Sequence, residues 1–221
     1  MQEPVSVTGI ILKAEPIGEY DRRVVILTRE RGKIAAFARG ARKQKSRLLA
    51  STNPFCFGEF RLYEGRSSYS ISEASISNYF EGLREDFEQA CYGMYFLEMM
   101  DYYTRENNDE KEMLRLLYQS LRALQHEGLS NRLVRYIFEI KALAVEGEYP
   151  GPPTDGESYE ESTLYALSYI SASSIEKLYT FTVKPKVLDE LGRIADSYRA
   201  RFVDRKLKSL EILKFHVENQ G

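Results

Sequence analysis

The chain has 221 residues, of which 43% are hydrophobic and 29% charged, and its formal net charge is −2. This composition is typical of a soluble globular protein with one large domain or two small ones. A membrane-spanning helix is excluded, because the longest run without a charged residue, Ser162 to Ile175, has 14 residues and a span needs about 18. The first residues also lack the apolar segment of a secretion signal. We therefore expect a cytoplasmic protein without a membrane partner.

The first 80 residues are rich in β-branched residues and turn signals, which predicts strands. The expected strands cover residues 5–16, 24–28, 34–40, 55–65 and 68–77. Gly32 suits a tight hairpin, and Gly58 interrupts the alternation of apolar residues that begins at Phe55, as a β-bulge would. Five short strands with a bulge predict a small closed barrel, for which an OB-fold is the first choice and an SH3-like barrel the second.

From about Leu83 onward, apolar residues recur every three or four positions, which predicts helices. The expected helices cover residues 83–97, 113–124, 133–144, 162–170, 173–179, 187–202 and 206–216. The first of them carries Leu83, Phe87, Cys91, Met94 and Leu97 at this spacing, and the third would be capped by Ser130 and ended by Gly147. We therefore expect an α+β chain, with an OB-fold barrel over residues 1–80 and an all-α helical domain over residues 81–221.

Charge is divided unevenly between these two parts. Residues 1–80 contain 13 Lys/Arg and 8 Asp/Glu, whereas residues 81–221 contain 18 and 25. The strongest positive stretch is "RGARKQKSR", from Arg39 to Arg47, with five positive charges and no negative one. A solvated loop is the plain interpretation, and a surface for polyanions is the alternative. A nuclear address signal is the least favoured interpretation, because the stretch lies inside an expected folded module.

Aromatic residues favour the alternative, because they are dense in the same module. They are Phe37, Phe55, Phe57, Phe60, Tyr63 and Tyr69. A barrel that combines basic residues with stacking rings can hold single-stranded nucleic acid without sequence preference. Most of these rings are expected in the barrel core, which leaves one or two to stack on bases.

Catalytic motifs are missing from the chain. There is no P-loop, G-x-G-x-x-G, G-x-S-x-G or H-E-x-x-H sequence. The acidic run from Asp109 to Glu112 stands at an expected helix start, where negative charge stabilises the helix dipole. Cys56 and Cys91 lie among apolar neighbours at no metal-ligand spacing, and His126 and His216 stand alone. We expect buried reduced thiols, no metal, no cofactor and a binding protein rather than an enzyme.

Residues 9–48 resemble the N-terminal module of the bacterial RecO family. That family opens with a strand, a Gly-Glu-x-Asp turn, a T-x-x-x-G hairpin and an A-R-G-A-R-x-x-x-S run. The matching residues here are Gly18, Glu19 and Asp21, then Thr28 and Gly32, then Ala38 to Arg42 with Ser46. The segments 138–150, 162–170 and 205–213 resemble the family's helical domain in the same order.

The resemblance runs nearly end to end and implies a role in recombinational DNA repair. Family members bind single- and double-stranded DNA, anneal complementary strands, and act with RecR on DNA coated by single-strand-binding protein. Such a protein would be found at the nucleoid during repair. Many relatives carry a four-cysteine zinc-binding insertion, but the corresponding segment here, residues 151–162, contains no cysteine. We infer that the zinc module has been lost.

The resemblance also implies roles for individual residues. Arg39, Arg42, Lys43, Lys45 and Arg47 are the expected contacts to the DNA backbone, and weaker candidates are Arg22, Arg23 and Lys33. Relatives hold the acidic tail of single-strand-binding protein on the helical domain, and the helix carrying Arg132, Arg135 and Lys141 could serve this purpose. Solvated helix charges are the alternative for these three residues. For the whole chain, the alternative functions are an RNA-binding barrel protein of the translation or RNA-processing machinery and, less favoured, an enzyme with a hidden metal site.

Overall fold

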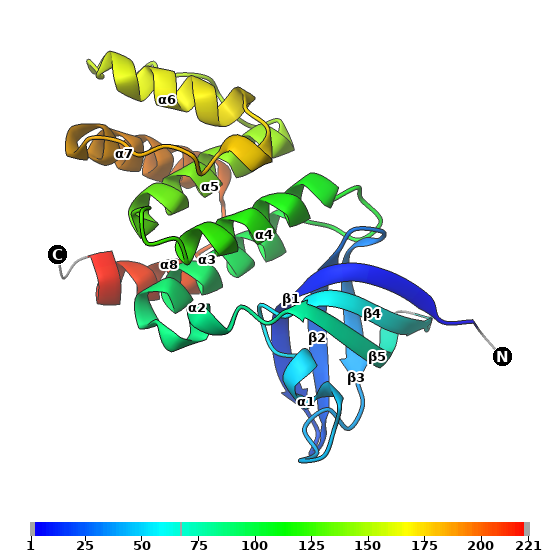
Figure 1. Cartoon of the computed structure of the whole chain (residues 1–221). Coiled ribbons are helices and arrows are strands. Elements are labelled where there is room, and N and C mark those ends of the chain that lie inside the picture. The colour runs from blue at the N-terminus through cyan, green and yellow to red at the C-terminus, as the bar shows by residue number, and fades with distance from the viewer. Residues whose placement is uncertain (1–2, 67, 219–221) are drawn as a thin grey trace. The chain divides into compact units, whose positions relative to one another are not determined.

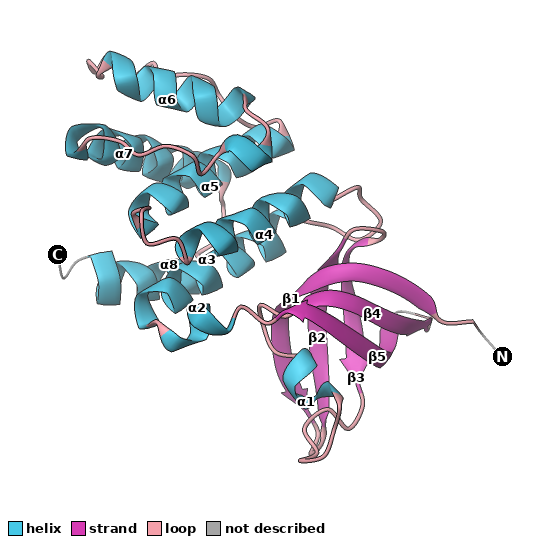
Figure 2. Cartoon of the chain, in the orientation of Figure 1, coloured by secondary structure: helices cyan, strands magenta, loops and turns pink. Residues whose placement is uncertain are grey.

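The structure, a computed structural model, describes residues 3–66 and 68–218, and it contains a β-barrel and a set of helices (Figures 1 and 2). The chain forms two compact units. The barrel unit comprises residues 1–84 and 97–114, and the helical unit comprises residues 85–96 and 115–221. Residues 97–114, which we expected in the helical domain, therefore pack with the barrel, and a domain boundary after residue 80 stays a prediction.

Five strands close the barrel of the first unit. They are β1 (Val5–Ile17), β2 (Asp21–Thr28), β3 (Gly32–Ala38), β4 (Phe57–Glu64) and β5 (Tyr69–Asn78). Their order around the barrel is β1-β2-β3-β5-β4, and every neighbouring pair is antiparallel except β3 and β5. A short helix, α1 (Leu48–Ser51), connects β3 to β4. The five expected strands and the OB-fold are confirmed.

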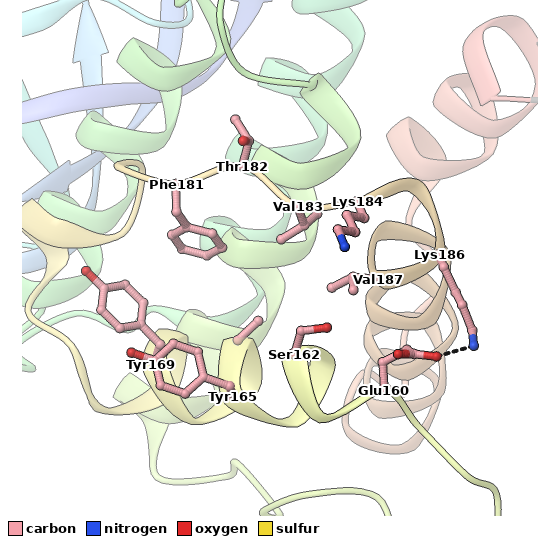
Figure 3. A pocket seen from close by; sticks show the side chains of 11 residues that line it. Glu160, Ser162, Tyr165, Tyr169, Phe181, Thr182, Val183, Lys184, Lys186 and Val187 are labelled. Atoms are coloured by element: carbon pink, nitrogen blue, oxygen red, sulfur yellow. Dashed lines mark hydrogen bonds and ion pairs between the residues drawn. The ribbon is translucent and has the colours of Figure 1, made fainter.

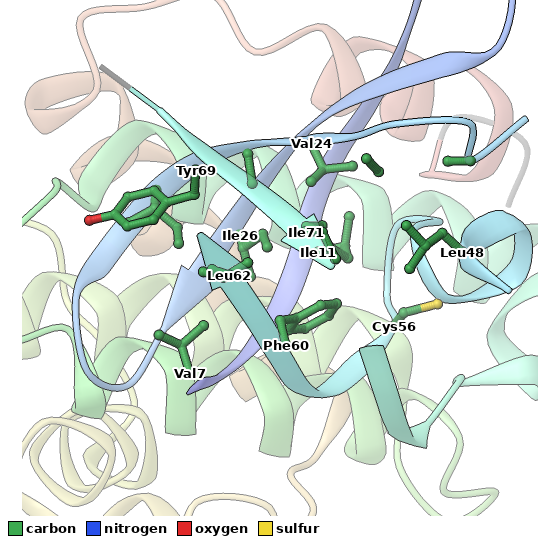
Figure 4. Close-up of a cluster of buried hydrophobic side chains, with 14 residues drawn as sticks. Val7, Ile11, Val24, Ile26, Leu48, Cys56, Phe60, Leu62, Tyr69 and Ile71 are labelled. Carbon is green, nitrogen blue, oxygen red and sulfur yellow. The ribbon is translucent and has the colours of Figure 1, made fainter. Parts of the chain in front are cut away.

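The barrel core follows from the alternation of side chains along each strand. In β3, every second residue from Gly32 to Ala38 is buried, and the residues between them lie on the outer face. The apolar side chains of the inner faces form one cluster (Figure 4) that includes Val7, Ile11, Val24, Ile26, Phe60, Leu62, Tyr69 and Ile71. Burial of this cluster stabilises the barrel and so gives the loops at its ends a rigid base.

The start of β4 differs in one respect from the expectation. The pairing of β4 with β5 shifts register between Phe57 and Gly58, which confirms the bulge. A side chain at Gly58 could not be accommodated, because its Cβ would lie 2.2 Å from the carbonyl oxygen of Ser75. The prediction that Phe55 belongs to this strand is wrong: Phe55 has a φ of 72° and is buried before the strand begins. The backbone turns there because the Phe55 N–H donates to the Ile11 carbonyl at 3.1 Å.

The helices occupy most of the remaining chain. They are α2 (Glu81–Glu85), α3 (Phe87–Tyr103), α4 (Lys111–Leu124), α5 (Asn131–Glu146), α6 (Glu161–Ala172), the 3₁₀ helix η1 (Ile175–Lys177), α7 (Pro185–Phe202), α8 (Lys208–Leu213) and the π-helix η2 (Lys214–Glu218). In the helical unit, α5, α6 and α7 pack against one another. Gly147 ends α5 with a φ of 76°, as expected, whereas the Ser130 side chain makes no capping hydrogen bond. Among the described residues, no helix has the length and apolar character needed to cross a membrane.

The expected helix over residues 83–97 is two helices. The chain breaks at Asp86, whose carboxylate accepts a hydrogen bond from the Gln89 N–H at 2.9 Å and so starts α3 at Phe87. Phe87 is 63% exposed and Met94 is exposed as well, although both share the three- and four-residue spacing by which the helix was expected. The reason is that α3 buries other large side chains, including Tyr92, Tyr95 and Phe96, so apolar residues surround the helix and their spacing does not define one buried face.

Candidate nucleic-acid interface

The positive stretch of the sequence forms the loop between β3 and α1, which we call the basic loop and define as residues 39–47. Its backbone is tied to the turn between β1 and β2. The Gly40 N–H donates to a carboxylate oxygen of Asp21 at 2.7 Å, and the Arg42 N–H donates to the Tyr20 carbonyl at 2.8 Å. Gly40 has a φ of 65°, which glycine adopts without strain. Ala41 is fully buried in the barrel core. The basic loop is therefore held near its start, at residues 40–42.

Consecutive turns shape the rest of the basic loop. The Lys43 N–H donates to the Gly40 carbonyl at 3.1 Å, and the Ser46 N–H donates to the Lys43 carbonyl at 2.9 Å. The Ser46 hydroxyl then accepts from the Leu48 N–H at 3.2 Å, at the first residue of α1. These bonds satisfy the backbone locally and leave the charged side chains directed to solvent.

The five cations of the basic loop fall into two groups. Arg39, Lys43, Lys45 and Arg47 are exposed, and within the described residues none of them forms an ion pair with a carboxylate. Arg42 is exposed too, but its guanidinium donates to the carbonyls of Gly18 and Glu19 at 3.3 and 3.2 Å. Part of the Arg42 guanidinium is therefore engaged in holding the loop in place and is less available to a ligand.

Arg22, a weaker candidate, is occupied inside the barrel unit. Its guanidinium donates to the Leu49 carbonyl, the Thr52 hydroxyl and the Asn53 side-chain oxygen at 3.0, 3.0 and 2.9 Å. Burial lowers its pKa, and repulsion by Arg42 lowers it further. A guanidinium stays charged nevertheless, so Arg22 adds to the positive field while it fastens α1 to the barrel.

The other two weaker candidates differ in position. Arg23 is exposed on the outer face of β2, with its guanidinium 3.7 Å from the Glu15 carboxylate. Lys33 lies at the opposite end of β3, roughly 17 Å from Ala38 at the usual rise per strand residue. Its ammonium is 3.3 Å from the carboxylate of Asp101, which also pairs with Lys13 at 2.6 Å. The structure therefore does not bring Lys33 together with the basic loop.

Only half of the aromatic residues singled out in the barrel sequence belong to its core, so the prediction that most of them do is wrong. Phe55, Phe60 and Tyr69 are buried, whereas Phe37 and Phe57 are half-buried and Tyr63 is exposed on β4. One ring beside the basic loop was missed by sequence reasoning: Tyr20 is 46% exposed, and the Lys43 ammonium lies 5.5 Å from its ring centroid. The signal was its place inside the Gly-Glu-x-Asp turn, between Glu19 and Asp21. An exposed ring beside exposed cations is the combination that binds single strands.

The three basic residues predicted to bind a partner lie on α5, but their environments differ. Arg135 is only 1% exposed; its guanidinium pairs with Glu139 at 2.9 Å and with Asp196 at 2.7 Å. Lys141 is also buried, and its ammonium donates to the carbonyls of Ser171 and Ser173.

Arg132 alone has a largely exposed head among these three residues. Its side chain is 46% exposed and pairs with Asp189 at 3.1 Å. The interpretation as solvated helix charges therefore suits Arg132 and not the other two. An assignment of any of the three to a partner stays a prediction.

Metal binding finds no support in the side chains. In the described part of the chain, no group of three His, Cys, Asp or Glu residues could hold a metal ion. Cys56 and Cys91 are free and buried, as expected. Burial raises the pKa of both thiols, which makes them poor nucleophiles and poor metal ligands near neutral pH.

Comparison with known proteins agrees with the two-part organisation. Residues 1–80 match the family model "Recombination protein O N terminal", and residues 84–151 and 152–211 match "Recombination protein O C terminal". The chain is 28% identical to DNA repair protein RecO of Clostridium novyi, over 94% of this chain and 92% of the relative. It is 28% identical to RecO of Acetivibrio thermocellus, over 94% and 95%, and 29% identical to RecO of Clostridium perfringens strain 13, over 94% and 96%. The chain belongs to the RecO family of DNA repair proteins.

Proposed function

We propose that this protein is a non-enzymatic recombination mediator that binds single- and double-stranded DNA and anneals complementary strands. The observation that carries the proposal is the basic loop: four exposed cations that have no carboxylate partner among the described residues, on a backbone held by Asp21 and by the barrel core. Neutralising phosphates with such cations releases counterions, which supplies affinity without sequence preference. A protein with this role would act where chromosomal DNA lies, at the nucleoid.

We further propose that it acts with RecR on DNA coated by single-strand-binding protein, as the family membership suggests. The test is annealing of complementary strands that carry this coat, with and without RecR. A mediator should anneal them, and RecR should change the rate. A general RNA-binding barrel protein should instead be blocked by the coat and should prefer RNA, and that result would contradict the proposal.

For the acidic tail of single-strand-binding protein, Arg132 is the candidate contact on α5. Its exposed guanidinium supports this choice, although a tail carboxylate would have to compete with Asp189. We expect Arg132→Glu to weaken binding of a tail peptide at least several-fold and to leave binding of naked DNA nearly unchanged. Arg122→Glu, an exposed change on α4, is the control. Unchanged tail binding in the Arg132 variant would place the tail elsewhere.

A further inference from the structure

The helical unit contains a second surface feature, which the basic loop does not explain. It is a groove of about 590 Å³ between α6 and the extended segment that leads into α7 (Figure 3). We call it the aromatic groove and define it by Tyr165, Tyr169, Phe181, Lys184 and Val187. Its volume lies in the range of sites that hold small molecules or single residues of a polymer.

Three rings line one end of the aromatic groove and touch in series. The rings of Tyr165 and Tyr169 lie 6.4 Å apart at an interplanar angle of 25°, and Tyr169 meets Phe181 edge-on at 5.4 Å. Tyr165 is 71% exposed, so burial in the fold does not account for this large ring. A ring left in water beside two others offers a face on which a flat ligand can stack.

A positive charge lies beyond the rings. Figure 3 shows Lys184 on the groove side of the segment, and its ammonium has no hydrogen bond or ion pair to any described residue. The other lysine of the lining, Lys186, is neutralised by an ion pair with Glu160. The same rim is the start of α7, which has no side-chain cap, so the positive end of the helix dipole adds to the field of Lys184.

We propose that the aromatic groove is a second contact for single-stranded DNA, at which one or two bases stack on the tyrosines and a phosphate pairs with Lys184. A nucleotide carries a flat ring and an anion within one residue, which matches rings and a cation set side by side. A groove for the apolar face of an amphipathic helix is hydrophobic throughout, whereas Ser162, Thr182 and Lys184 contribute polar groups to this lining. The inference rests on the proposed function in that the ligand is DNA, but it concerns residues remote in sequence from the basic loop.

Such a contact would give the annealing activity a physical basis. Annealing needs two strands on one protein, and the basic loop and the aromatic groove would bind by different forces. The loop binds mainly through charge, whereas the groove would bind mainly through stacking, with about one phosphate contact. Binding at the groove should therefore depend little on salt.

The test is photo-crosslinking of the full-length protein to a thymine oligonucleotide in which one base is replaced by 5-iodouracil, followed by peptide mapping. We expect crosslinks within residues 160–187 that persist when salt is raised. Tyr165→Ala should lower their yield by about fivefold or more, because stacking on one ring is lost. Tyr165→Phe should retain the yield, and Phe215→Ala, which removes another exposed ring of the helical unit, should leave it unchanged.

Three outcomes would overturn the inference. Crosslinks confined to the barrel unit would show that the aromatic groove holds no DNA while DNA binding itself stands. No crosslink anywhere would count against the proposed function as well. A crosslink yield for Tyr165→Leu equal to that for Tyr165→Phe would mean that an apolar side chain is enough to hold the ligand, as it would be for a peptide. Stacking of a base on the Tyr165 ring would then be excluded.

Discussion

Replacing the three exposed cations of the basic loop that follow Arg42 tests this loop directly. We predict that Lys43→Ala/Lys45→Ala/Arg47→Ala binds single-stranded DNA more weakly and with a shallower salt dependence. Each phosphate contact contributes about −0.7 to the slope of log K against log salt for single strands. Three lost contacts therefore make the slope shallower by about 2. Between about 50 and about 200 mM salt, the wild-type affinity should fall roughly 20-fold further than the affinity of the variant.

The assay is fluorescence anisotropy of a labelled oligonucleotide over a series of salt concentrations, with melting curves alongside. Melting should be unchanged, because the three side chains are exposed and their charges have no carboxylate partners among the described residues. Arg122→Ala/Lys177→Ala/Arg201→Ala removes the same net charge from other exposed positions that have no carboxylate partner among the described residues, and it is the matched control. Parallel salt lines for wild type and loop variant would refute the reasoning, as would an equal change in the control.

Arg22 provides a contrast within the same part of the sequence. Its guanidinium donates to three oxygens in α1 and in the two residues that follow it, so Arg22→Ala removes hydrogen bonds rather than a free cation. We expect a loss of about 1–3 kcal/mol in the free energy of unfolding, measured by urea denaturation. The salt slope should change less than in the loop variant. A variant of unchanged stability would mean that the three bonds are not formed in solution.

Three further predictions concern other parts of the molecule. Asp21→Ala should weaken DNA binding, because the Gly40 N–H loses the acceptor that fixes the basic loop, even though the substitution makes the chain more positive. Tighter binding by this variant would show that net charge, and not the geometry of the loop, determines the affinity for DNA. Burial opposes ionisation of Asp196, but hydrogen bonding from Arg199 and the charges of Arg135 and Lys214 lower its pKa to about 2. A carboxyl group with a lowered pKa stabilises the fold above its unfolded pKa, near 4, and this contribution is lost as the pH falls toward 2. The Asp196→Asn variant should therefore be less stable than wild type at neutral pH. In acid denaturation it should also lose less stability than wild type between about pH 4 and pH 2. Equal losses in the two proteins would contradict the stabilising role of the Asp196 carboxylate. Finally, elemental analysis should find no stoichiometric zinc, and the melting temperature should not change in chelator, since two cysteines cannot supply four thiolates.

The barrel could be predicted from the sequence because its signals are local. Alternating burial in β3 and the glycine at position 58 are visible in a few consecutive residues. Helix α3 shows the limit of such signals, because apolar residues surround it and no buried face stands out. Phe55 was misassigned for a related reason: its positive φ depends on a hydrogen bond to Ile11, which lies 44 positions earlier.

The sequence predicted that residues 133–144 form a helix, but it did not show which charged side chains of α5 would be buried. Asp196, the partner of Arg135, lies 61 positions later on α7, and the carbonyl acceptors of Lys141 lie at the end of α6 and just after it. A charge that finds such partners can be buried, whereas the same charge without them must stay in water. No local pattern separates these cases. The same reasoning applies to Lys33, whose partner Asp101 comes from α3.

The two short motifs that carry the family resemblance depend on each other physically. Asp21, at the end of the Gly-Glu-x-Asp turn, accepts the Gly40 N–H, and Arg42 returns hydrogen bonds to the carbonyls of Gly18 and Glu19. Ala41 lies between these two links and is buried in the barrel core, so a larger side chain there would displace both. A loop of five positive charges would otherwise repel itself and spread into solvent. The acidic and carbonyl groups of the turn offset that repulsion at one point, Arg42, and leave the other four cations available to phosphates.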